Sequence, residues 1–478
     1  MSTTPLNMVQ VQQRVAAELL RIGPVIDELG ERFASAGEEL ALVGGPVRDA
    51  MLGRLQQDLD FTTSATPEVT ERLLKGWAEH IWDVGRAFGT IGCRRGPWQV
   101  EITTYRAEAY DRRSRKPEVA FGTSLVDDLQ RRDFTVNSMA VRLPGNTFED
   151  PFGGIVDLAN RVLRTPGRPE DSFSDDPLRM MRAARFAAQL AFTVDPDVVA
   201  AMTEMAERIE IISAERVRDE LVKLVCAPYP RLGLSLLVET GLAARVLPEL
   251  PALALERDEH NRHKDVYEHT LTVLEQAIDL EGRLGGEPDF ISRFAALMHD
   301  VGKPRTRRFL GDGTVTFHHH DVVGAKLTRK RMQALKFPTD TVDAVCSLVE
   351  LHLRFHGYGS GEWTDSAVRR YVRDAGDQLE RLHVLTRADC TTRNRRRADR
   401  LRRTYDDLEA RIARLSAEEE LASIRPDLDG NQIMEILGIG PGQEVGQAYR
   451  FLLDLRLDEG PMSQEAARDA LVAWWARR

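Results

Sequence analysis

The sequence predicts an α+β protein in which a small mixed sheet with helices comes first and a long, mostly helical part follows. Two observations on patterning predict this class. Between about residues 40 and 165, short β-like runs alternate with helical segments. From about residue 174 onward, apolar residues recur with the helical period almost without interruption. The length of 478 residues, with 42% hydrophobic residues, is enough for several units that each bury a core.

The elements are expected in the following order. Apolar residues at helical spacing predict a helix over residues 9–36. The β-like runs are ELALVGG, DLDFTTSA, TIGCRRGPWQVEITTY and VNSMAVRL, and the segment TPEVTERLLKGWAEH between them is helical in pattern. Residues 105–122, rich in Arg, Lys and Ser, are expected to form a mobile loop. Later helices include DPLRMMRAARFAAQLAF and SAERVRDELVKLV, and a break with glycine and proline at 282–288 separates two helices.

Composition limits the class of protein. The formal net charge of −10 argues against a generally cationic nucleic-acid binder, although it says nothing about local basic patches. The four cysteines show no C-x-x-C pairing, so neither a disulfide framework nor a thiolate zinc site is indicated. Neither a secretory signal nor an apolar span of 18 residues is recognisable, so we expect a cytoplasmic protein without membrane partners. The sequence does not predict the oligomeric state.

Asp58 and Asp60 stand one residue apart in the strand-like run DLDF. Strand alternation puts both carboxylates on one face and Leu59 and Phe61 on the other. Because the like charges repel, the pair either faces water at a strand end or binds divalent cations, and by itself it leaves both interpretations open. Two oxygen-ligated Mg²⁺ ions about 3.5–4 Å apart are the arrangement that holds the attacking and leaving oxygens in phosphoryl transfer.

The neighbouring residues favour a metal and phosphate site. Gly44 and Gly45 end the preceding strand, and glycine lets backbone N–H groups approach a triphosphate closely. Arg48 carries a fork of donors suited to a phosphate. In WQVEITTY, Glu101 lies on the polar face of its strand and would supply a third carboxylate for a second metal or for deprotonating a hydroxyl. Taken singly, each feature also fits a turn or a solvated strand face.

Five motifs in order carry a resemblance to a known family. They are VGGPVRDAMLGR with DLDF, RRDFTVNSMA (131–140), DPFGGIVDL (150–158), DDPLRMMRAARFA (175–187) and ISAERVRDEL (212–221). Together they resemble the class II tRNA nucleotidyltransferases and bacterial poly(A) polymerases, which belong to the polymerase-β-type nucleotidyltransferase superfamily. The resemblance implies a polymerase-β-type nucleotidyltransferase head followed by a helical neck.

The resemblance also implies roles for individual residues. Asp58 and Asp60 would be the catalytic, Mg²⁺-binding carboxylates, with Glu101 in support. Asp133 would lie near the ribose. The nucleotide-binding residues would be Gly44, Gly45, Arg48, Arg132, Asp133, Asp176, Arg179, Arg182 and Arg185.

The fourth motif resembles the family's nucleotide-reading helix. On a helix, Asp176, Arg179 and Arg182 fall at i, i+3 and i+6, and Arg185 follows at i+9, so they drift slowly around one face. In the family such residues pair with C or A in place of a nucleic-acid template. An ordinary salt bridge on a solvated helix would have the same spacing. The usual glutamate of the family's EDxxR pattern is Asp175 here.

A second set of chemically active residues lies between residues 260 and 390. Adjacent His-Asp on an apolar helix, with further histidines on later helices, suits one or two divalent metals that activate a water for phosphoester hydrolysis. The order resembles the HD phosphohydrolase domain, which implies a divalent transition metal. A lone helical histidine is more often a packed core residue. The expected ligands are His269, His299, Asp300, His320, His352 and Asp389.

The resemblances together imply template-independent addition or repair of the 3′-terminal CCA of tRNA, from CTP and ATP, with release of pyrophosphate. Enzymes that add only CC or only A, a poly(A) polymerase acting on RNA 3′ ends, and an HD phosphohydrolase with an inactive, RNA-binding head remain as alternatives. The arginine-dense stretch 392–405 would follow the phosphates of a tRNA or form a solvated face. The expected parts are an N-terminal helix (1–36), the catalytic head (37–165), a nucleotide-recognising neck (166–255), an HD domain (256–400) and an RNA-binding C-terminal body (401–478).

Overall fold

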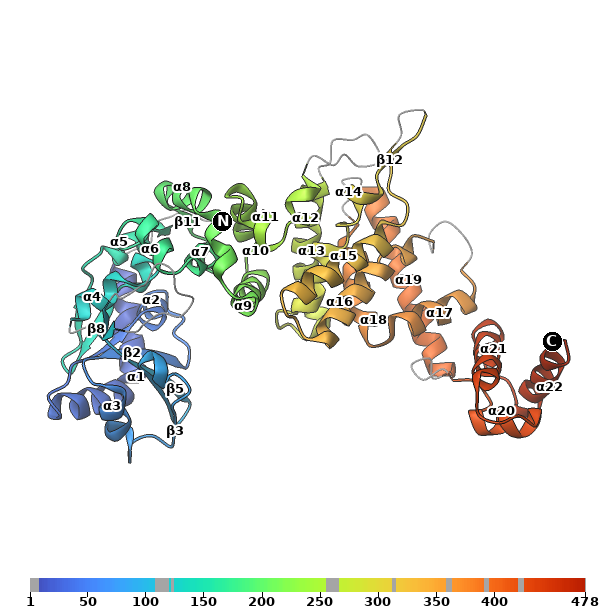
Figure 1. Cartoon of the computed structure of the whole chain (residues 1–478), viewed down its shortest axis with the longest axis horizontal. Coiled ribbons are helices and arrows are strands. Elements are labelled where there is room, and N and C mark those ends of the chain that lie inside the picture. The colour runs from blue at the N-terminus through green and yellow to red at the C-terminus, as the bar shows by residue number, and fades with distance from the viewer. Residues whose placement is uncertain are drawn as a thin grey trace. The chain divides into compact units, whose positions relative to one another are not determined.

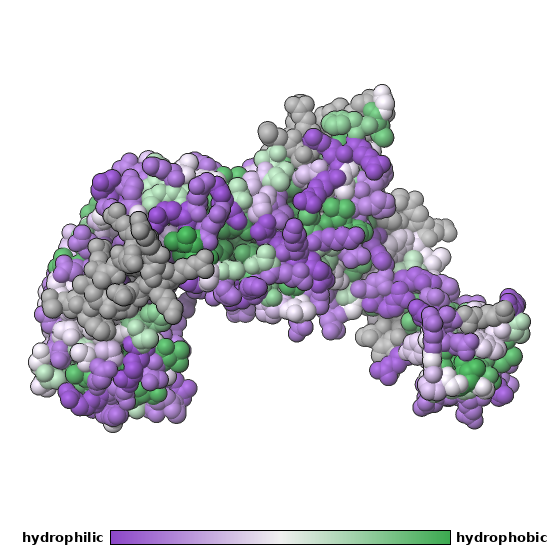
Figure 2. Space-filling view, viewed as in Figure 1, coloured by the Kyte–Doolittle hydropathy of each residue, from purple (hydrophilic) through white to green (hydrophobic). Residues whose placement is uncertain are grey.

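The computed structural model describes residues 8–107, 120–121, 124–254, 266–311, 315–357, 363–390, 395–419 and 425–477. The chain forms two compact units, Met1–Val246 and Leu247–Arg478, coloured blue to green and yellow to red in Figure 1. Hydrophilic residues cover most of the face shown in Figure 2. No helix in the described ranges is both long and apolar enough to span a membrane. The loop expected at 105–122 falls mostly outside these ranges.

The first unit is built on a mixed sheet of seven strands in the order β3-β4-β5-β2-β1-β8-β9. Every neighbouring pair is antiparallel except β2 and β5, which are parallel. β1 is buried along its whole length and lies in the middle of the sheet, where it pairs with β2 and β8. The strands are β1 (Leu40–Val43), β2 (Asp58–Thr63), β3 (His80–Trp82), β4 (Thr90–Arg95), β5 (Trp98–Thr104), β8 (Ala140–Leu143) and β9 (Thr147–Glu149).

The alternation predicted for two strands is confirmed. In β2, Asp58 and Asp60 are exposed and Leu59 is buried, and in β5 Val100 and Ile102 are fully buried. The strand predicted over VNSMAVRL is shorter than expected, because only its last four residues form β8. The preceding residues form a 3₁₀ turn, η2 (Thr135–Asn137), which follows the buried Asp133.

Helices cover the sheet and continue into the neck. The helix predicted at the start of the chain is confirmed as α1. α7 packs against α9 and α10, and it approaches α10 so closely that a Cβ on Gly233 would lie 2.3 Å from the carbonyl oxygen of Ala184. The helices are α1 (Met8–Ser35), α2 (Gly45–Met51), α3 (Pro67–Leu74), α4 (Leu125–Gln130), α5 (Gly154–Asn160), α6 (Pro169–Asp175), α7 (Leu178–Leu190), α8 (Pro196–Glu204), α9 (Ala214–Val225), α10 (Pro230–Glu239) and α11 (Leu242–Val246).

The prediction that Asp176 shares a helix with Arg179, Arg182 and Arg185 is wrong. α6 ends at Asp175 and α7 begins at Leu178, so Asp176 lies between them in an extended conformation with φ −141° and ψ 99°. The cause is Pro177, because a proline disfavours the helical conformation of the residue before it. The Asp176 carboxylate accepts a hydrogen bond from the backbone N–H of Leu178 at 3.1 Å, which helps α7 to begin.

The second unit is helical. α12, α13, α16 and α18 pack around one apolar core, α15 packs on α16, and α20, α21 and α22 form a smaller apolar cluster of their own. The arginine-dense stretch begins α19, where Arg400, Arg402 and Arg403 are exposed. The helices are α12 (Val266–Asp279), α13 (Phe290–Met298), α14 (Lys303–Thr306), α15 (His320–Ala334), α16 (Thr339–Leu351), α17 (Asp365–Ala375), α18 (Leu379–Ala388), α19 (Arg395–Glu419), α20 (Gly430–Leu437), α21 (Gln443–Glu459) and α22 (Gln464–Trp475).

Candidate active site and metal cluster

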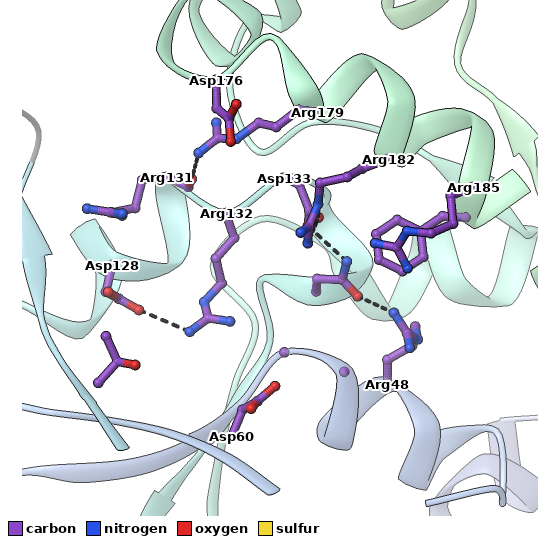
Figure 3. Close-up of a pocket in the computed structure, with 15 residues that line it drawn as sticks. Arg48, Asp60, Asp128, Arg131, Arg132, Asp133, Asp176, Arg179, Arg182 and Arg185 are labelled. Carbon is purple, nitrogen blue, oxygen red and sulfur yellow. Dashed lines mark hydrogen bonds and ion pairs between the residues drawn. The ribbon is translucent and has the colours of Figure 1, made fainter. Parts of the chain in front are cut away.

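A polar cavity of about 470 Å³ opens within the first unit, between β2, α2 and α7 (Figure 3). All nine residues predicted to bind nucleotide line it. Of the three predicted catalytic carboxylates, Asp60 lines the cavity, and Glu101 is the residue paired with Asp60 across the parallel β2–β5 ladder. The lining residues are Gly44, Gly45, Arg48, Asp60, Thr103, Asp128, Arg131, Arg132, Asp133, Asn137, Asp176, Arg179, Arg182, Arg185 and Phe186.

Gly44 is at a position that only glycine suits. Its φ is 73°, and a Cβ there would lie 2.8 Å from Nη1 of Arg132. The missing side chain therefore lets the turn after β1 lie against the Arg132 guanidinium. Arg132 is held in turn by Asp128, whose carboxylate lies 3.2 Å from its Nη2 (Figure 3).

A chain of polar contacts connects the head to α7. Nη1 of Arg48 donates to Oδ1 of Asn137 at 2.6 Å, and Nδ2 of Asn137 donates to Asp133 at 2.9 Å. Nε of Arg182 donates to the other oxygen of Asp133 at 2.7 Å (Figure 3). Asn137 and Asp133 are buried, so the contacts are shielded from water. Two arginines from different elements are thereby fixed at one cavity.

Two of the aspartates that line this cavity, Asp133 and Asp60, have pKa values shifted in opposite directions. Burial opposes the charge on Asp133, but Arg182 and the hydrogen bond from Asn137 outweigh it and hold the pKa of Asp133 well below its usual range. The pKa of Asp60 is raised to about 6, first because the crowded cavity removes water from the carboxylate, and then because Glu101 and Asp58 are close. Asp60 therefore has surface in contact with water, although protein atoms crowd around most of its carboxylate.

The residues of the fourth motif are held by neighbours that the sequence did not single out. Nη1 of Arg179 donates to Oγ of Ser172 at 2.8 Å, and its Nη2 donates to the backbone carbonyl of Arg131. Nη2 of Arg216, from α9, donates to Asp176 at 2.8 Å. Asp176 and Arg179 therefore sit beside each other at the cavity, although only Arg179 is helical (Figure 3).

Arg185 lines the cavity, but its charge is engaged inside the protein. Its Nε donates to Glu220 of α9 at 2.6 Å, and both residues are buried. Its guanidinium lies 4.0 Å from the centre of the Phe186 ring, a cation–π contact. Arg48 and Arg182 also lie near that ring, at 5.3 and 5.7 Å.

Sequence reasoning missed several residues that build the cavity. The signal that could have found them is their position in the sequence, because each lies inside or next to one of the five motifs. The residue types themselves did not indicate a role. These residues are Asp128, Arg131, Asn137, Phe186, Arg216 and Glu220.

In the second unit the structure brings together all six residues predicted as metal ligands. His269, His299 and Asp389 form one group, and Asp300, His320 and His352 form another, with the ligand atoms of each group within 4.8 Å of one another. The groups adjoin, because Nε2 of His299 lies 3.2 Å from Asp300 and 3.6 Å from Asp389. We call these six residues the histidine–aspartate cluster.

The buried histidines of the cluster are oriented for metal binding. Nδ1 of His299, His320 and His352 lies 2.6–2.8 Å from the carbonyl oxygen three residues earlier, which it faces as a donor. Each Nε2 is then the atom left for a metal, and within the described ranges these three atoms are buried without a hydrogen-bond partner. Burial lowers the pKa of His299, but Asp300 and Asp389 outweigh it and raise that pKa to about 10, so its Nε2 must release a proton to bind a metal. Burial lowers the pKa of His352 to about 3, so its ring is neutral. These nitrogen and oxygen donors fit a divalent transition metal.

Gly302 allows the segment that carries Asp300 to pack closely against α15, which carries His320. A Cβ at this position would lie 2.0 Å from the carbonyl oxygen of His320 and 2.7 Å from the backbone nitrogen of Gly324. Any larger residue would therefore push α15 away from the segment that carries Asp300.

Three family models match successive parts of the chain. The poly A polymerase head domain matches residues 40–164, the probable RNA and SrmB-binding site of polymerase A matches 191–253, and the HD domain matches 266–394. The crystal structure of the Bacillus stearothermophilus CCA-adding enzyme in complex with CTP has the same fold, with a TM-score of 0.65 at 24% identity over 94% of this chain and 96% of that one. The chain is therefore of the class of proteins in which a nucleotide-transferring head is joined to an HD domain.

Curated relatives specify the family. The A-adding tRNA nucleotidyltransferase of Deinococcus radiodurans is 35% identical over 443 residues, which cover 91% of this chain and 95% of that protein. The CCA-adding enzyme of Levilactobacillus brevis is 43% identical over 213 residues, 44% of this chain and 52% of that protein. The chain belongs to the tRNA nucleotidyltransferase family.

Proposed function

We propose that this protein adds or repairs the 3′-terminal CCA of tRNA, using CTP and ATP and releasing pyrophosphate. The observation that carries the proposal is the cavity in which arginines of the head and of α7 converge on the strand that bears Asp58 and Asp60. Similarity to CCA-adding enzymes, in sequence over 44% of this chain and in fold over 94% of it, supports it.

The proposed division of labour follows from charge and geometry. Arg48, Arg132 and Arg182 would bind the phosphates of the incoming nucleotide, because guanidinium forks match phosphate oxygens. Gly44 and Gly45 would let the triphosphate approach the backbone, and Phe186 offers an aromatic face nearby.

Recognition of the base would fall to Asp176 and Arg179. The two side chains offer an acceptor and donors side by side, which suits the Watson–Crick edge of C or A. Arg131 and Arg216, which contact them, would keep these groups in place.

The family uses a divalent metal, and Mg²⁺ is the ion we propose for the head. The carboxylates fit it, because Asp58 and Asp60 share an exposed strand face and Glu101 is paired with Asp60 in the ladder. A bound Mg²⁺ would supply charge neutralisation at the phosphates and activation of the attacking 3′-hydroxyl. The protein's own contribution is to place Asp60 and the arginines in one cavity, with Asp58 on the same strand face and Glu101 on the neighbouring strand.

The test is extension of a tRNA that lacks its CCA end, with CTP and ATP supplied separately and together. We expect growth by C, C and A, followed by a stop, and no growth with Asp58→Ala. Long A-tracts from ATP alone would indicate a poly(A) polymerase and contradict the proposal. No addition to this tRNA, together with no addition of A to a tRNA that already ends in CC, would favour an HD phosphohydrolase with an inactive head.

A second candidate is an enzyme that adds only the terminal A. It is favoured by the similarity to the A-adding enzyme of Deinococcus radiodurans, which extends over nearly the whole chain. Two substrates together separate the candidates: a tRNA that already ends in CC, which both enzymes extend with ATP, and a tRNA that lacks both C residues, which only a CCA-adding enzyme extends with CTP. An A-adding enzyme would extend the first tRNA with ATP and would leave the second unchanged in the presence of CTP.

We further propose that the histidine–aspartate cluster binds a divalent transition metal and supports phosphoester hydrolysis as a second activity. The three buried Nε2 atoms are the supporting observation. The predicted cytoplasmic location and the domain boundaries remain predictions, as does the contact of α19 with tRNA.

A further inference from the structure

A two-stranded hairpin projects from the helices of the second unit (Figure 1). Its strands are β12 (Arg308–Phe309) and β13 (Val315–Thr316), paired antiparallel with Arg308 opposite Thr316 and Phe309 opposite Val315. It connects the part of the chain that carries Asp300 to the part that carries His320. None of the chemistry assigned so far uses it.

Both ends of the hairpin are attached to the histidine–aspartate cluster. On one side Nζ of Lys303 lies 2.7 Å from Asp300, and on the other the carbonyl oxygen of Phe317 lies 2.8 Å from Nδ1 of His320. Lys303 also lies 5.7 Å from the centre of the Phe317 ring, so the two ends meet. Phe309 is six residues from Lys303, which limits its distance from that lysine to roughly 20 Å.

The hairpin and the segment leading to it combine exposed apolar and basic side chains. Phe309 is 70% exposed and Leu310 is 50% exposed, and Arg305, Arg307 and Arg308 are exposed as well. The guanidinium of Arg307 lies 5.3 Å from the centre of the Phe309 ring. An exposed aromatic face among arginines is the chemistry that binds single-stranded nucleic acid, because bases stack on the ring while phosphates pair with the cations.

The charge of the surroundings supports this assignment. Arg305, Arg307 and Arg308 place three positive charges within four residues, in a chain whose net charge is −10. A partner that binds through a purely apolar face would not need them, whereas a polyanion would. A phosphate at the end of such a strand is also the group on which a histidine–aspartate metal cluster acts.

We propose that strand β12 and the segment before it, residues 305–309, form a binding arm for single-stranded RNA. It stacks a base on Phe309, holds adjacent phosphates with Arg305, Arg307 and Arg308, and directs a phosphate-bearing 3′ end toward the histidine–aspartate cluster. The last part of this proposal rests on the metal site proposed above. Binding to the arm does not depend on it.

The first experiment measures RNA binding by the full-length protein without metal. The probe is a 5′-fluorescein hexauridylate with a 3′-phosphate, which lacks the hydroxyl that the head extends, and the readout is fluorescence anisotropy. We expect Phe309→Ala and Phe309→Leu to weaken binding about ten-fold and Phe309→Tyr to bind like the wild type, because stacking needs a ring. Arg307→Glu combined with Arg308→Glu should reduce the slope of log affinity against log salt by about 1.4.

Val84→Ser is the matched control, because Val84 is an exposed apolar residue, 88% accessible, in the other unit. It should bind the probe like the wild type. Unchanged binding by Phe309→Ala and by the double arginine variant would overturn the proposal. Wild-type binding by Phe309→Leu would also overturn it, since it would show an apolar contact instead of a stacked base.

A second experiment tests where the strand ends. The same probe with 4-thiouridine as its last nucleotide is cross-linked, and the modified peptide is identified by mass spectrometry. Cross-links to His318, His319 or their neighbours are expected, and cross-links confined to the first unit would contradict delivery to the cluster. Failure of the cluster to take up Mn²⁺ would count against the metal site alone, because neither RNA experiment requires a metal.

Discussion

At the scale of single residues, buried polar groups fix the charges that face the nucleotide cavity. Asp133 accepts from Arg182 and Asn137, and Asn137 accepts from Arg48. Each guanidinium therefore has a defined place before a ligand arrives, which lowers the cost of ordering long side chains on binding.

The first prediction concerns Asn137. Asn137→Ala removes one acceptor of Arg48, which also pairs with Asp49, and one donor to Asp133, and the loss of hydrogen bonds to charged groups costs binding free energy. We expect the KM for the incoming nucleotide to rise about ten-fold, measured by steady-state addition to tRNA. Asn160→Ala, at the exposed end of α5, is the control and should leave the KM for the nucleotide unchanged. An unaltered KM for Asn137→Ala would show that Arg48 does not need this contact.

The second prediction is a pH dependence. Because the pKa of Asp133 is lowered on folding, its carboxylate stabilises the protein above its unfolded pKa of about 3.9, and that contribution is lost as the pH falls below this value. Asp133→Asn should lower the free energy of unfolding by about 2 kcal/mol at pH 7. The difference from the wild type should shrink by about 1 kcal/mol between pH 5 and pH 3, measured by urea denaturation.

The control for Asp133 is Asp127→Asn, because Asp127 is exposed on α4. Its effect on the free energy of unfolding should be small at every pH. A difference between Asp133→Asn and the wild type that stays constant from pH 7 to pH 3 would contradict the ionic role of Asp133.

At the scale of elements, the position of α7 depends on a buried ion pair. Arg185 of α7 donates to Glu220 of α9 at 2.6 Å, and α7 also packs on α10. α7 carries Arg179 and Arg182 into the cavity, so its packing decides where these side chains lie. The pair thus links helix packing in the neck to nucleotide binding.

The third prediction separates a role of Arg185 in helix packing from a role in binding the nucleotide. Glu220→Gln leaves a buried guanidinium without its counter-charge and should destabilise the protein by about 3 kcal/mol, measured by guanidinium chloride denaturation. Combining Arg185→Met with Glu220→Leu should restore most of that stability, because an apolar pair of similar volume needs no counter-charge. Equal destabilisation by the single and the double variant would contradict the prediction. If the stable double variant keeps its nucleotide affinity, Arg185 acts through packing alone.

At the scale of the whole molecule, the two candidate sites lie in separate compact units. The nucleotide cavity belongs to Met1–Val246 and the histidine–aspartate cluster to Leu247–Arg478. Among the described residues, all those that line the cavity come from the first unit and all six of the cluster come from the second.

The fourth prediction follows from this separation. His352→Ala should lower the metal content of the protein after dialysis, measured by elemental analysis, and leave nucleotide addition to tRNA within two-fold of the wild type. Asp58→Ala should abolish addition and leave the metal content of the cluster unchanged. If His352→Ala abolished addition in a folded protein, the two sites would be coupled.

The sequence by itself determined the order of the elements and the identity of most site residues. Period-two alternation located the carboxylate faces of β2 and β5, and the helical period located the neck and the second unit. These patterns are local, because they depend on a side chain's own position in a strand or helix. The six cluster residues were also predicted before the fold was known. Their order along the chain resembles that of the HD domain, and the resemblance indicated that they bind metal together, which their spacing could not.

The tertiary structure decided what each site residue contacts. Asn137 and Asp133 become an organising pair because η2 and the residues just before it bring them to Arg48 and Arg182. No local pattern marks a buried asparagine as a partner of distant arginines. Pro177 is a local signal that α7 begins late, yet only the fold shows Asp176 held by Arg216 of α9. Long-range contacts depend on how elements pack. The free energy of packing comes from many residues together, so no single motif predicts it.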